Sequence, residues 1–566
     1  MRTAHAVTAY AWTREEVFLD AAGDGIGLLL AMPTWCWAAH ERFAAARSEV
    51  VPDPARPYLD LGAAETVSLL AWCDFIIGDE LDARAPGLRR RLRAGLDARG
   101  FAPFLDCHEW EWIGTGARPV NNWNAWICGQ ILTACLLVVD DDHRRSAIAR
   151  TAMERLDVFI ASIPADGGID EGFAYWWEGP ARLLEGARAL DEASHGVLGI
   201  AGHPPLQESG WFPVRMRWSR DWFVNPADGP ARPEGHLPWH IPHHWARRTN
   251  DQELARISAE QRDRSRPVGE LRDSQGIGRA LVALFDEDWA GLPTGMPRSA
   301  PPSTNLPDTQ IVVAHAPSGL SYALKGGHNA ESHNHLDIGA VSIALDGIPC
   351  IIDLGAPTYT ARTFSDRRYE EWVTQTRWHS CPTPWGTEQG IGREYAANAW
   401  TVSSATGGLR ASLDVARAYA LPQLRSWVRT VSYNHNGTSL ELRDEATAKP
   451  EHPADDVGGT PLMTTRLILA GTVTLEDACA VVGGAQDPDG DPALDVSGPW
   501  CDLPVPSRCD REPRRLRLSW DGRTVSASLE RRTMTDPRLA RVWGGSIARL
   551  TLTCTTPTLR VTAAPA

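Results

Sequence analysis

The feature that most constrains the fold is a change in hydrophobic periodicity near residue 300. Apolar residues recur every three or four positions before residues 291–307 and alternate with polar residues after them, and the segment itself is rich in Pro, Gly and Ser. A chain of 566 residues is also too long for one hydrophobic core. We therefore predict a helical domain over 1–290, a linker over 291–307 and a domain of antiparallel sheets over 308–566.

Helical periodicity is strongest in four segments of the first half. The last of them begins with Pro180, a residue that suits the first turn of a helix. Several helical hairpins of this kind are typical of a helical toroid or bundle. The predicted helices cover residues 63–77, 125–139, 145–160 and 180–191.

Strand-like runs in the second half flank turn residues. Asp346-Gly347 and Asp521-Gly522 each separate two such runs, and Asp-Gly between apolar runs is a strong hairpin signal. A third pair of alternating runs surrounds the Asn434–Gly437 turn. The pattern indicates a stack of antiparallel sheets. The predicted strands cover residues 312–316, 321–324, 340–345, 348–353, 424–433, 439–443, 515–520 and 523–529.

A histidine-rich run, Glu331-Ser-His-Asn-His-Leu-Asp337, lies among these strands. On a strand, alternate side chains share a face, so His333, His335 and Asp337 would point the same way. The hairpin at 346–347 would return Asp353 toward the histidines, and two His with one Asp form a plausible zinc-binding set.

Two other features bear on that zinc prediction. His379 is a candidate for a further, remote ligand. The rival ligand run of metallo-β-lactamase-like hydrolases needs a second His where this chain has Ile338, which weakens that alternative. A lone His in a β-rich region is usually an ordinary core or surface residue, so the prediction depends on the cluster.

The balance of charge limits the classes of partner. The chain has 56 basic and 71 acidic residues and a formal net charge of -15. Nucleic-acid binding needs a basic surface, so we expect no nucleic-acid partner. An anionic substrate stays open, because a small basic cleft can lie on an acidic body.

Cysteines and apolar segments bear on the compartment. The 11 Cys show no C-x-x-C spacing, so we expect buried thiols and a reducing compartment. The N-terminus lacks the apolar core of a secretory signal, and the apolar run Ile131–Val139 is too short to span a bilayer. We expect a cytoplasmic protein without a membrane partner, or a secreted or periplasmic one if a leader has been removed.

Tryptophan is concentrated in the helical half, with 15 of the 24 Trp before residue 250. Most of them should belong to the core. Trp beside polar groups can also form a platform for sugar rings. Two segments, Asn121–Asn124 and Asp170–Glu178, have that composition.

These motifs together resemble the heparinase II/III-like superfamily of polysaccharide lyases. The resemblance implies an α+β multidomain fold, in which an N-terminal (α/α) incomplete toroid is followed by a C-terminal antiparallel β-sheet sandwich. It covers most of the chain. It rests on Asn121–Asn124, Glu171–Tyr175, His333–Asp337, Asp353–Gly355 with Tyr359, and His379.

The resemblance also implies roles for individual residues. One mainly structural zinc ion would be bound by His335, Asp353 and His379. The groups facing the sugar would be Tyr175, His333 and one of Asn121, Asn122 or Asn124, with Tyr359 and Tyr369 as further catalytic candidates. Substrate-binding candidates are Trp123, Trp176, Glu171, Glu178 and Arg362.

The implied reaction is β-elimination at a uronic acid, which leaves a 4,5-unsaturated uronate end. The expected partner is an anionic, uronate-containing oligo- or polysaccharide, with a homodimer left open. A glycoside hydrolase is an alternative, because Asp170, Glu171 and Glu178 could supply the two carboxylic acids that hydrolysis needs. A carbohydrate-binding protein without catalytic activity but with a structural zinc is the third alternative.

Overall fold

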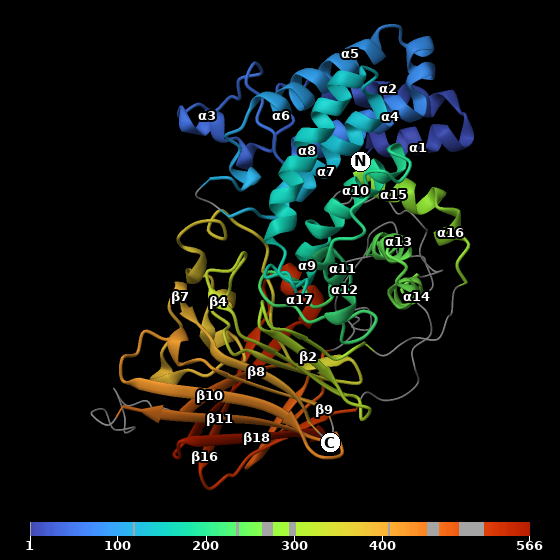
Figure 1. Cartoon of the computed structure of the whole chain (residues 1–566). Helices are drawn as coiled ribbons and strands as arrows, with labels where there is room; N and C mark the ends of the chain where they lie inside the picture. The colour runs from blue at the N-terminus through green and yellow to red at the C-terminus, as the bar shows by residue number, and fades with distance from the viewer. Residues whose placement is uncertain are drawn as a thin grey trace. The chain divides into compact units, whose positions relative to one another are not determined.

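The computed structural model of the chain divides into two compact units that are each discontinuous in sequence (Figure 1). The first comprises Met1–Ile163, Trp176–Gly210 and His236–Arg298, and the second comprises Pro164–Tyr175, Trp211–Gly235 and Ser299–Ala566. The structure describes residues 2–116, 119–233, 237–262, 276–293, 301–405, 408–449, 463–485 and 514–566.

The segment predicted as a linker, 291–307, is only partly described. It contains the short strand β1, Thr304–Leu306, while its residues 294–300 lie outside the described residues. Two segments from the first half of the sequence, 164–175 and 211–235, form part of the second unit. Tyr175 is therefore a residue of the second unit.

The first unit is built of helices. The four predicted helices are confirmed as α4 (Leu61–Arg84), α7 (Asn122–Val138), α8 (Asp142–Ser162) and α10 (Pro180–Ala193). The other helices of this unit are α1 (Arg2–Thr13), α2 (Glu16–Ala31), α3 (Arg42–Ala46), α5 (Leu88–Leu96), α6 (Ala102–Asp106), α11 (Pro204–Gly210), α13 (His240–Arg248), α14 (Gln252–Glu260), α15 (Gly276–Phe285) and α16 (Glu287–Ala290). Helix α9 (Phe173–Trp176) crosses the boundary between the units.

Side chains at the helix starts explain where these helices begin. The carboxylates of Asp60 and Asp141 accept hydrogen bonds from backbone amides in the first turns of α4 and α8, and the Asn121 side chain does the same for α7. Such caps satisfy amides that have no partner within the helix. Helices α7 and α10 then pack closely at Gly129, where a Cβ atom would lie 2.6 Å from the Arg182 carbonyl oxygen.

Helix α4 is long and apolar enough to cross a membrane, judged by length and composition alone. However, 67% of its most apolar 18-residue window is buried inside the structure. The core helix of a globular unit has the same composition, so α4 is weak evidence for a membrane span.

The second unit contains two eight-stranded antiparallel sheets. The order of the first sheet is β1-β2-β3-β5-β6-β12-β17-β16, and that of the second is β13-β14-β15-β18-β11-β10-β9-β8. The strands of the first sheet after β1 are β2 (Ile311–His315), β3 (Leu320–Lys325), β5 (Val341–Leu345), β6 (Ile348–Ile351), β12 (Met463–Ala470), β16 (Val525–Thr533) and β17 (Ser546–Cys554). Those of the second are β8 (Asn398–Ala405), β9 (Gly408–Asp414), β10 (Leu424–Tyr433), β11 (Leu440–Ala448), β13 (Val473–Glu476), β14 (Cys479–Val482), β15 (Leu516–Ser519) and β18 (Thr558–Pro565).

One apolar core joins the two sheets into a sandwich. Its members include Tyr322 and Ile343 from the first sheet and Trp427 and Val561 from the second, all nearly or fully buried. Strands β10 and β11 alternate buried and more exposed positions over much of their length, as the sequence pattern indicates. Helices α12 (Phe212–Arg215) and α17 (Pro537–Trp543) and the two-stranded β4 (His328–Asn329) and β7 (Gly392–Ala396) sheet complete this unit.

Two of the three predicted hairpins are confirmed and the third is wrong. Asp346 and Gly347 have φ values of 54° and 78° and connect β5 to β6, and β10 pairs with β11 across the 434–437 turn. The runs on either side of Asp521-Gly522 belong to different sheets, because β15 pairs with β14 and β18 while β16 pairs with β17. Asp521 turns the chain by accepting a hydrogen bond from the Arg523 amide, so it carries the chain from one sheet to the other.

The prediction that the histidine-rich run is a strand is also wrong. Residues 330–340 form turns and irregular backbone between β4 and β5, and His333 has a φ of 56°, in the left-handed region. The acidic side chains of Glu331 and Asp337 both pair with the Lys325 ammonium group on β3. An extended strand would hold these two residues too far apart to reach the same group. The run is a loop held by ion pairs at both ends.

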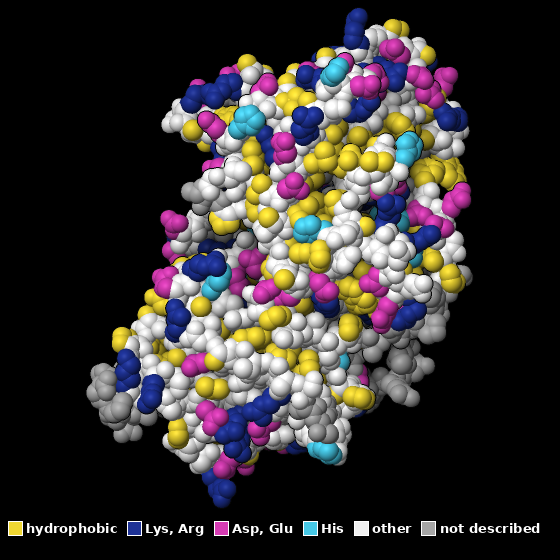
Figure 2. Space-filling model, viewed as in Figure 1, with side chains coloured by type: hydrophobic (Ala, Val, Ile, Leu, Met, Phe, Trp, Pro, Cys, Tyr) yellow, Lys and Arg dark blue, Asp and Glu magenta, His cyan; other side chains and the backbone are white. Residues whose placement is uncertain are grey.

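The surface agrees with the mixed charge of the sequence. Basic and acidic side chains are interspersed over the face drawn in Figure 2, which carries no continuous basic patch among the residues described there. Each cysteine in the described part of the chain is a free thiol, as predicted.

Candidate functional site

The centre of the site is the carboxylate of Asp228, a buried residue of the 211–235 segment. One of its oxygens, Oδ2, lies 2.9 Å from His333 Nδ1 and accepts a hydrogen bond from the Tyr359 hydroxyl at 3.2 Å. The other, Oδ1, lies 2.8 Å from His335 Nε2 and accepts from Arg368 Nη2 at 2.6 Å. Four side chains that are distant in sequence thus meet on one carboxylate.

Two tyrosines extend this network. The Tyr175 hydroxyl lies 2.6 Å from that of Tyr359. Since the Tyr359 proton goes to Asp228, the Tyr175 hydroxyl donates to the Tyr359 oxygen. The Tyr175 ring also stacks on the His333 ring, with 4.1 Å between ring centroids. The structure therefore brings together three of the predicted catalytic residues, Tyr175, His333 and Tyr359.

Electrostatics set the protonation of these groups. Burial opposes a charge on Asp228, but the hydrogen bonds from His333 and His335 and the nearby Arg368 hold its pKa well below the usual range. Burial and the neighbouring Tyr359 and Asp228 raise the pKa of Tyr175 well above that of free tyrosine, and burial and Asp228 raise the pKa of Tyr359 to about 12. At neutral pH the network is therefore one carboxylate with two neutral phenols.

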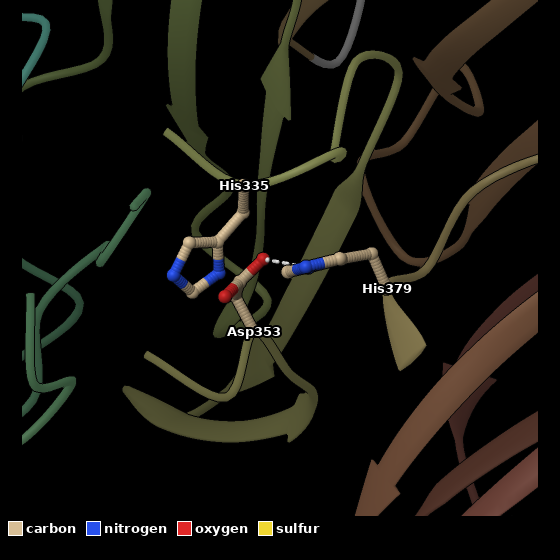
Figure 3. A group of neighbouring side chains, drawn as sticks. All are labelled: His335, Asp353 and His379. Atoms are coloured by element: carbon tan, nitrogen blue, oxygen red, sulfur yellow. Dashed lines mark hydrogen bonds and ion pairs between the residues drawn. The ribbon is translucent and has the colours of Figure 1, made fainter. Parts of the chain in front are cut away.

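The predicted metal ligands His335, Asp353 and His379 form a buried group beside this network. They offer ligand atoms that all lie within 4.8 Å of one another. Figure 3 shows the three side chains converging from separate segments, with His379 Nδ1 2.9 Å from Asp353 Oδ2. Asp337, which the strand prediction placed with them, bonds to Lys325 instead, with 2.7 Å between Nζ and Oδ1.

Unpartnered atoms test whether this group suits a metal ion. His335 Nδ1 and His379 Nε2 are buried, and no described residue supplies either of them with a hydrogen bond. Buried ring nitrogens without a partner are costly unless a ligand binds them. Two imidazoles and a carboxylate form a donor set that suits zinc, and the bond from His335 Nε2 to Asp228 is the outer-shell contact that metal-binding histidines usually make. The residues fit a metal ion.

The remaining candidates of the second unit lie at various distances from the network. Tyr369 accepts a hydrogen bond from Asn334 at 3.0 Å, and burial raises its pKa. Arg362 has a 46% exposed side chain that pairs with Glu370, so Arg368 rather than Arg362 is the arginine of the Asp228 network. Glu171 is buried.

Several candidates of the helical unit have structural roles. Asn124 is fully buried and donates to the carbonyl oxygens of Ile113 and Arg155. Trp176 is fully buried and donates to Ser209, so its ring is not a surface platform for sugar. Glu178 is paired with Arg182 and Arg279. These contacts assign the three side chains to the fold of the helical unit.

Three other residues lie near the start of α7. Asn121 caps the helix, Asn122 is its first residue and is buried, and Trp123 is partly buried against the His40 ring. Their predicted roles toward the substrate stay predictions. A separate cavity of about 830 Å³ in this unit is lined partly by Trp72, Trp245 and Arg188, and none of the predicted site residues lines it.

The sequence reasoning missed Asp228 and Arg368. Asp228 lies in an Asn-Pro-Ala-Asp-Gly turn, and such a turn alone does not distinguish a functional carboxylate from a solvated one. In the structure Asn225 anchors the turn by donating to the carbonyl oxygens of Gly229 and Asp353. Arg368 is one of several arginines in an irregular segment, so its role emerges only from its contacts.

Comparison with known proteins shows a family match for the part of the chain that carries most of this site. Residues 301–494 match the model of the heparinase II/III-like C-terminal region. This part of the chain is a heparinase II/III-like domain. The match contains His333, the three predicted metal ligands and Tyr359, so the resemblance seen in the sequence is confirmed. No curated protein matches the chain.

Solved structures extend the likeness over the whole chain. A heparinase III crystal structure superposes with a TM-score of 0.64 at 11% identity, covering 99% of this chain and 75% of that one. A heparan sulfate lyase from Pedobacter heparinus gives a TM-score of 0.57 at 12% identity, covering 99% and 74%. The predicted fold, a helical region before the antiparallel sheets of the heparinase II/III-like domain, is confirmed. The class that these neighbours share is that of polysaccharide lyases.

Proposed function

We propose that the chain is a lyase that cleaves uronic-acid-containing oligo- or polysaccharides by β-elimination and leaves 4,5-unsaturated uronate ends. The observation that carries the proposal is the network of Tyr175, Tyr359, Asp228 and His333. It holds an imidazole and a neutral phenol side by side in ring contact. An elimination needs one group that removes a proton and a second that supplies one.

His333 is suited to take the proton from C5 of the uronate. Its Nδ1 faces Asp228, which leaves Nε2 as the acceptor, and the side chain is 21% exposed. Asp228 stabilises the imidazolium that forms, as a buried carboxylate does for the histidine of a hydrolytic triad.

Tyr175 is suited to protonate the leaving glycosidic oxygen, because its raised pKa keeps the phenol neutral. In the balanced step the C5–H bond breaks, C4 and C5 form a double bond, and the C4–O4 bond breaks. O4 then takes the phenol proton. Stacking of the two rings places the resulting imidazolium beside the phenolate, and proton exchange with water restores both groups.

The residues that would hold zinc in this mechanism are His335, Asp353 and His379. Bound there, the ion would supply a fixed positive charge that orders the 330–340 loop through His335. The neutralisation of the substrate carboxylate by Asn121 or Asn122 stays a prediction from the sequence.

An assay on a panel of uronate polymers and oligomers tests the proposal. A lyase creates a conjugated unsaturated uronate, so absorbance in the ultraviolet should rise along with new reducing ends. New reducing ends without that absorbance would identify a hydrolase. Binding to the same polymers without either signal would identify a carbohydrate-binding protein without catalytic activity.

A further inference from the structure

The four hydrogen bonds to Asp228 account for all of its acceptor capacity. A carboxylate has two oxygens with about four lone-pair sites, and each oxygen here receives two of the four contacts described above. An ionised carboxylate cannot donate. Each of its four partners must therefore present a proton to it.

We infer that Asp228 is the positioning residue that fixes the tautomers of His333 and His335 together and thereby links the metal site to the proposed base. His333 must carry its proton on Nδ1, which leaves the Nε2 lone pair for proton abstraction. His335 must carry its proton on Nε2, which leaves the Nδ1 lone pair for a metal ion. The role of His333 as a base rests on the proposed function, whereas the assignment of the two tautomers does not.

The backbone around these contacts supports a positioning role. Ala227, next to Asp228, and His333, which contacts it, have φ values of 59° and 56°. Residues other than glycine rarely adopt this region. Arg368 also donates to the carbonyl oxygens of His333 and Asn334. Strained backbone of this kind persists where the surrounding contacts over-determine it.

The turn that carries Asp228 is fixed to the segment that carries Asp353. Asn225 donates to the Asp353 carbonyl oxygen at 3.2 Å, and a Cβ atom on Gly355 would lie 2.4 Å from the Gly229 carbonyl oxygen. Gly355 has a φ of 70°, which also favours glycine. The position of Asp228 is therefore fixed relative to two metal-ligand candidates. The backbone contacts around its turn fix it relative to Asp353, and a direct hydrogen bond fixes it relative to His335.

The isosteric variant Asp228→Asn makes the inference testable, because an amide has one acceptor oxygen and one donor nitrogen. Arg368 can only donate, and His335 must donate if its Nδ1 binds metal, so the amide oxygen should stay on their side. The amide NH2 then faces His333 and Tyr359, both of which can accept. His333 would respond by moving its proton to Nε2, which removes the lone pair that the proposed base needs.

The first measurement is nitrogen NMR of histidine-labelled protein in the zinc-loaded form, with the His333 signal assigned by its absence from His333→Gln. We expect the wild type to show His333 protonated at Nδ1 and Asp228→Asn to show it protonated at Nε2. Unchanged ring nitrogen signals of His333 in the variant, or a wild-type ring protonated at Nε2, would overturn the inference. This readout does not depend on activity, so it stands even if no uronate polymer is cleaved.

The second measurement compares metal content and turnover across three variants. Asp228→Asn should retain zinc but lose about 100-fold or more in kcat, the scale for loss of a general base. Asp228→Ala should lose both zinc and turnover. Asp414→Asn, whose carboxylate accepts from two backbone amides elsewhere in this unit, should change neither. Wild-type zinc content in Asp228→Ala would contradict the link to the metal site.

Discussion

Two buried charged clusters hold the 330–340 loop, and they differ in what they can do. At Lys325, one ammonium group pairs with Glu331 at 2.9 Å and with Asp337 at 2.7 Å. At Asp228, one carboxylate receives two imidazoles, a phenol and a guanidinium. The first cluster is one cation between two acidic side chains, whereas the second brings two imidazoles and a phenol, side-chain types that can transfer protons in a reaction, to one carboxylate.

The difference separates anchoring from chemistry within a single loop. Glu331 and Asp337, at the ends of the histidine-rich run, attach it to strand β3, while His333 and His335 between them face Asp228. We therefore expect changes at Lys325 to affect mainly stability and changes around Asp228 to affect mainly turnover or metal content. The following predictions test that division, from the largest expected effect to the smallest.

The largest effect should follow His335→Ala. This change removes a metal-ligand candidate and a donor to Asp228 at once, so zinc content should fall from about one ion per chain to nearly none, with a lower melting temperature and loss of turnover. Elemental analysis and calorimetry measure the first two. His435→Ala, at an exposed turn, is the control. If His335→Ala keeps stoichiometric zinc and its normal melting temperature, the ligand assignment is wrong.

Lys325→Met should reduce stability most among changes outside the Asp228 network. Removing one partner of a buried ion pair typically costs about 3–5 kcal/mol, because the remaining charges stay buried. The free energy of unfolding from chemical denaturation measures it, with Lys449→Met as the control. A loss of turnover without any loss of stability would remove the distinction between the two clusters.

Tyr175→Phe and His333→Ala should each reduce kcat by about 100-fold or more, the usual scale for a general acid or base. The melting temperature should fall less than in Lys325→Met, because Asp228 keeps three of its four donors in His333→Ala and all four in Tyr175→Phe. Initial rates and thermal melts of the same preparations measure both quantities. Near-normal rates in both variants would exclude the two residues from the mechanism.

The Lys325 cluster should produce a smaller, pH-dependent effect through Glu331. Burial raises the pKa of Glu331 to about 7, although Lys325 opposes the shift. The folded state then binds a proton that the unfolded chain releases near its ordinary pKa, so stability is lost as the pH rises from about 4.5 to 7. The melting temperature of the wild type, compared with that of Glu331→Gln, should fall as the pH rises over that range. A constant difference between the two would contradict the shift.

The smallest effect should follow Arg362→Ala. The side chain is 46% exposed, and exposed charges contribute little, so we expect KM to rise no more than about fivefold with kcat unchanged. Arg362 would then be a peripheral contact to an anionic substrate. Kinetics on the best polymer of the panel, at low and high salt, measure this contribution. A large fall in kcat would instead place Arg362 beside the reacting atoms.

Local patterns in the sequence predicted much of the fold. Periodicity identified α4, α7, α8 and α10, and the Asp346-Gly347 hairpin has the left-handed backbone that its residues favour. The same signal failed at Asp521-Gly522, because a turn sequence does not specify whether the next strand returns to the same sheet. Long-range pairing decides that, here between β16 and β17.

The site was predicted only in part, for a similar reason. The histidine-rich run supplied His333 and His335, but its expected strand geometry did not form. Both side chains face Asp228 because they contact its carboxylate, which comes from a distant part of the sequence. The alternation of side chains along a strand plays no part. Asp228 lies 105 residues before His333. A lone Asp in a turn gives no local sign of such a partner.

The interleaving of the chain between the two units has a consequence for how the protein is made. Tyr175 meets Tyr359, 184 residues later, and β6 gains its neighbour β12 only when residues beyond 460 are available. Such distant pairings form slowly, because the entropy cost of closing long loops comes before the contacts that offset it. During synthesis the 164–175 and 211–235 segments emerge before the sheets of the unit to which they belong. The nascent chain should therefore depend on chaperones over this interval, and the residues of the proposed site come together only when the interval ends.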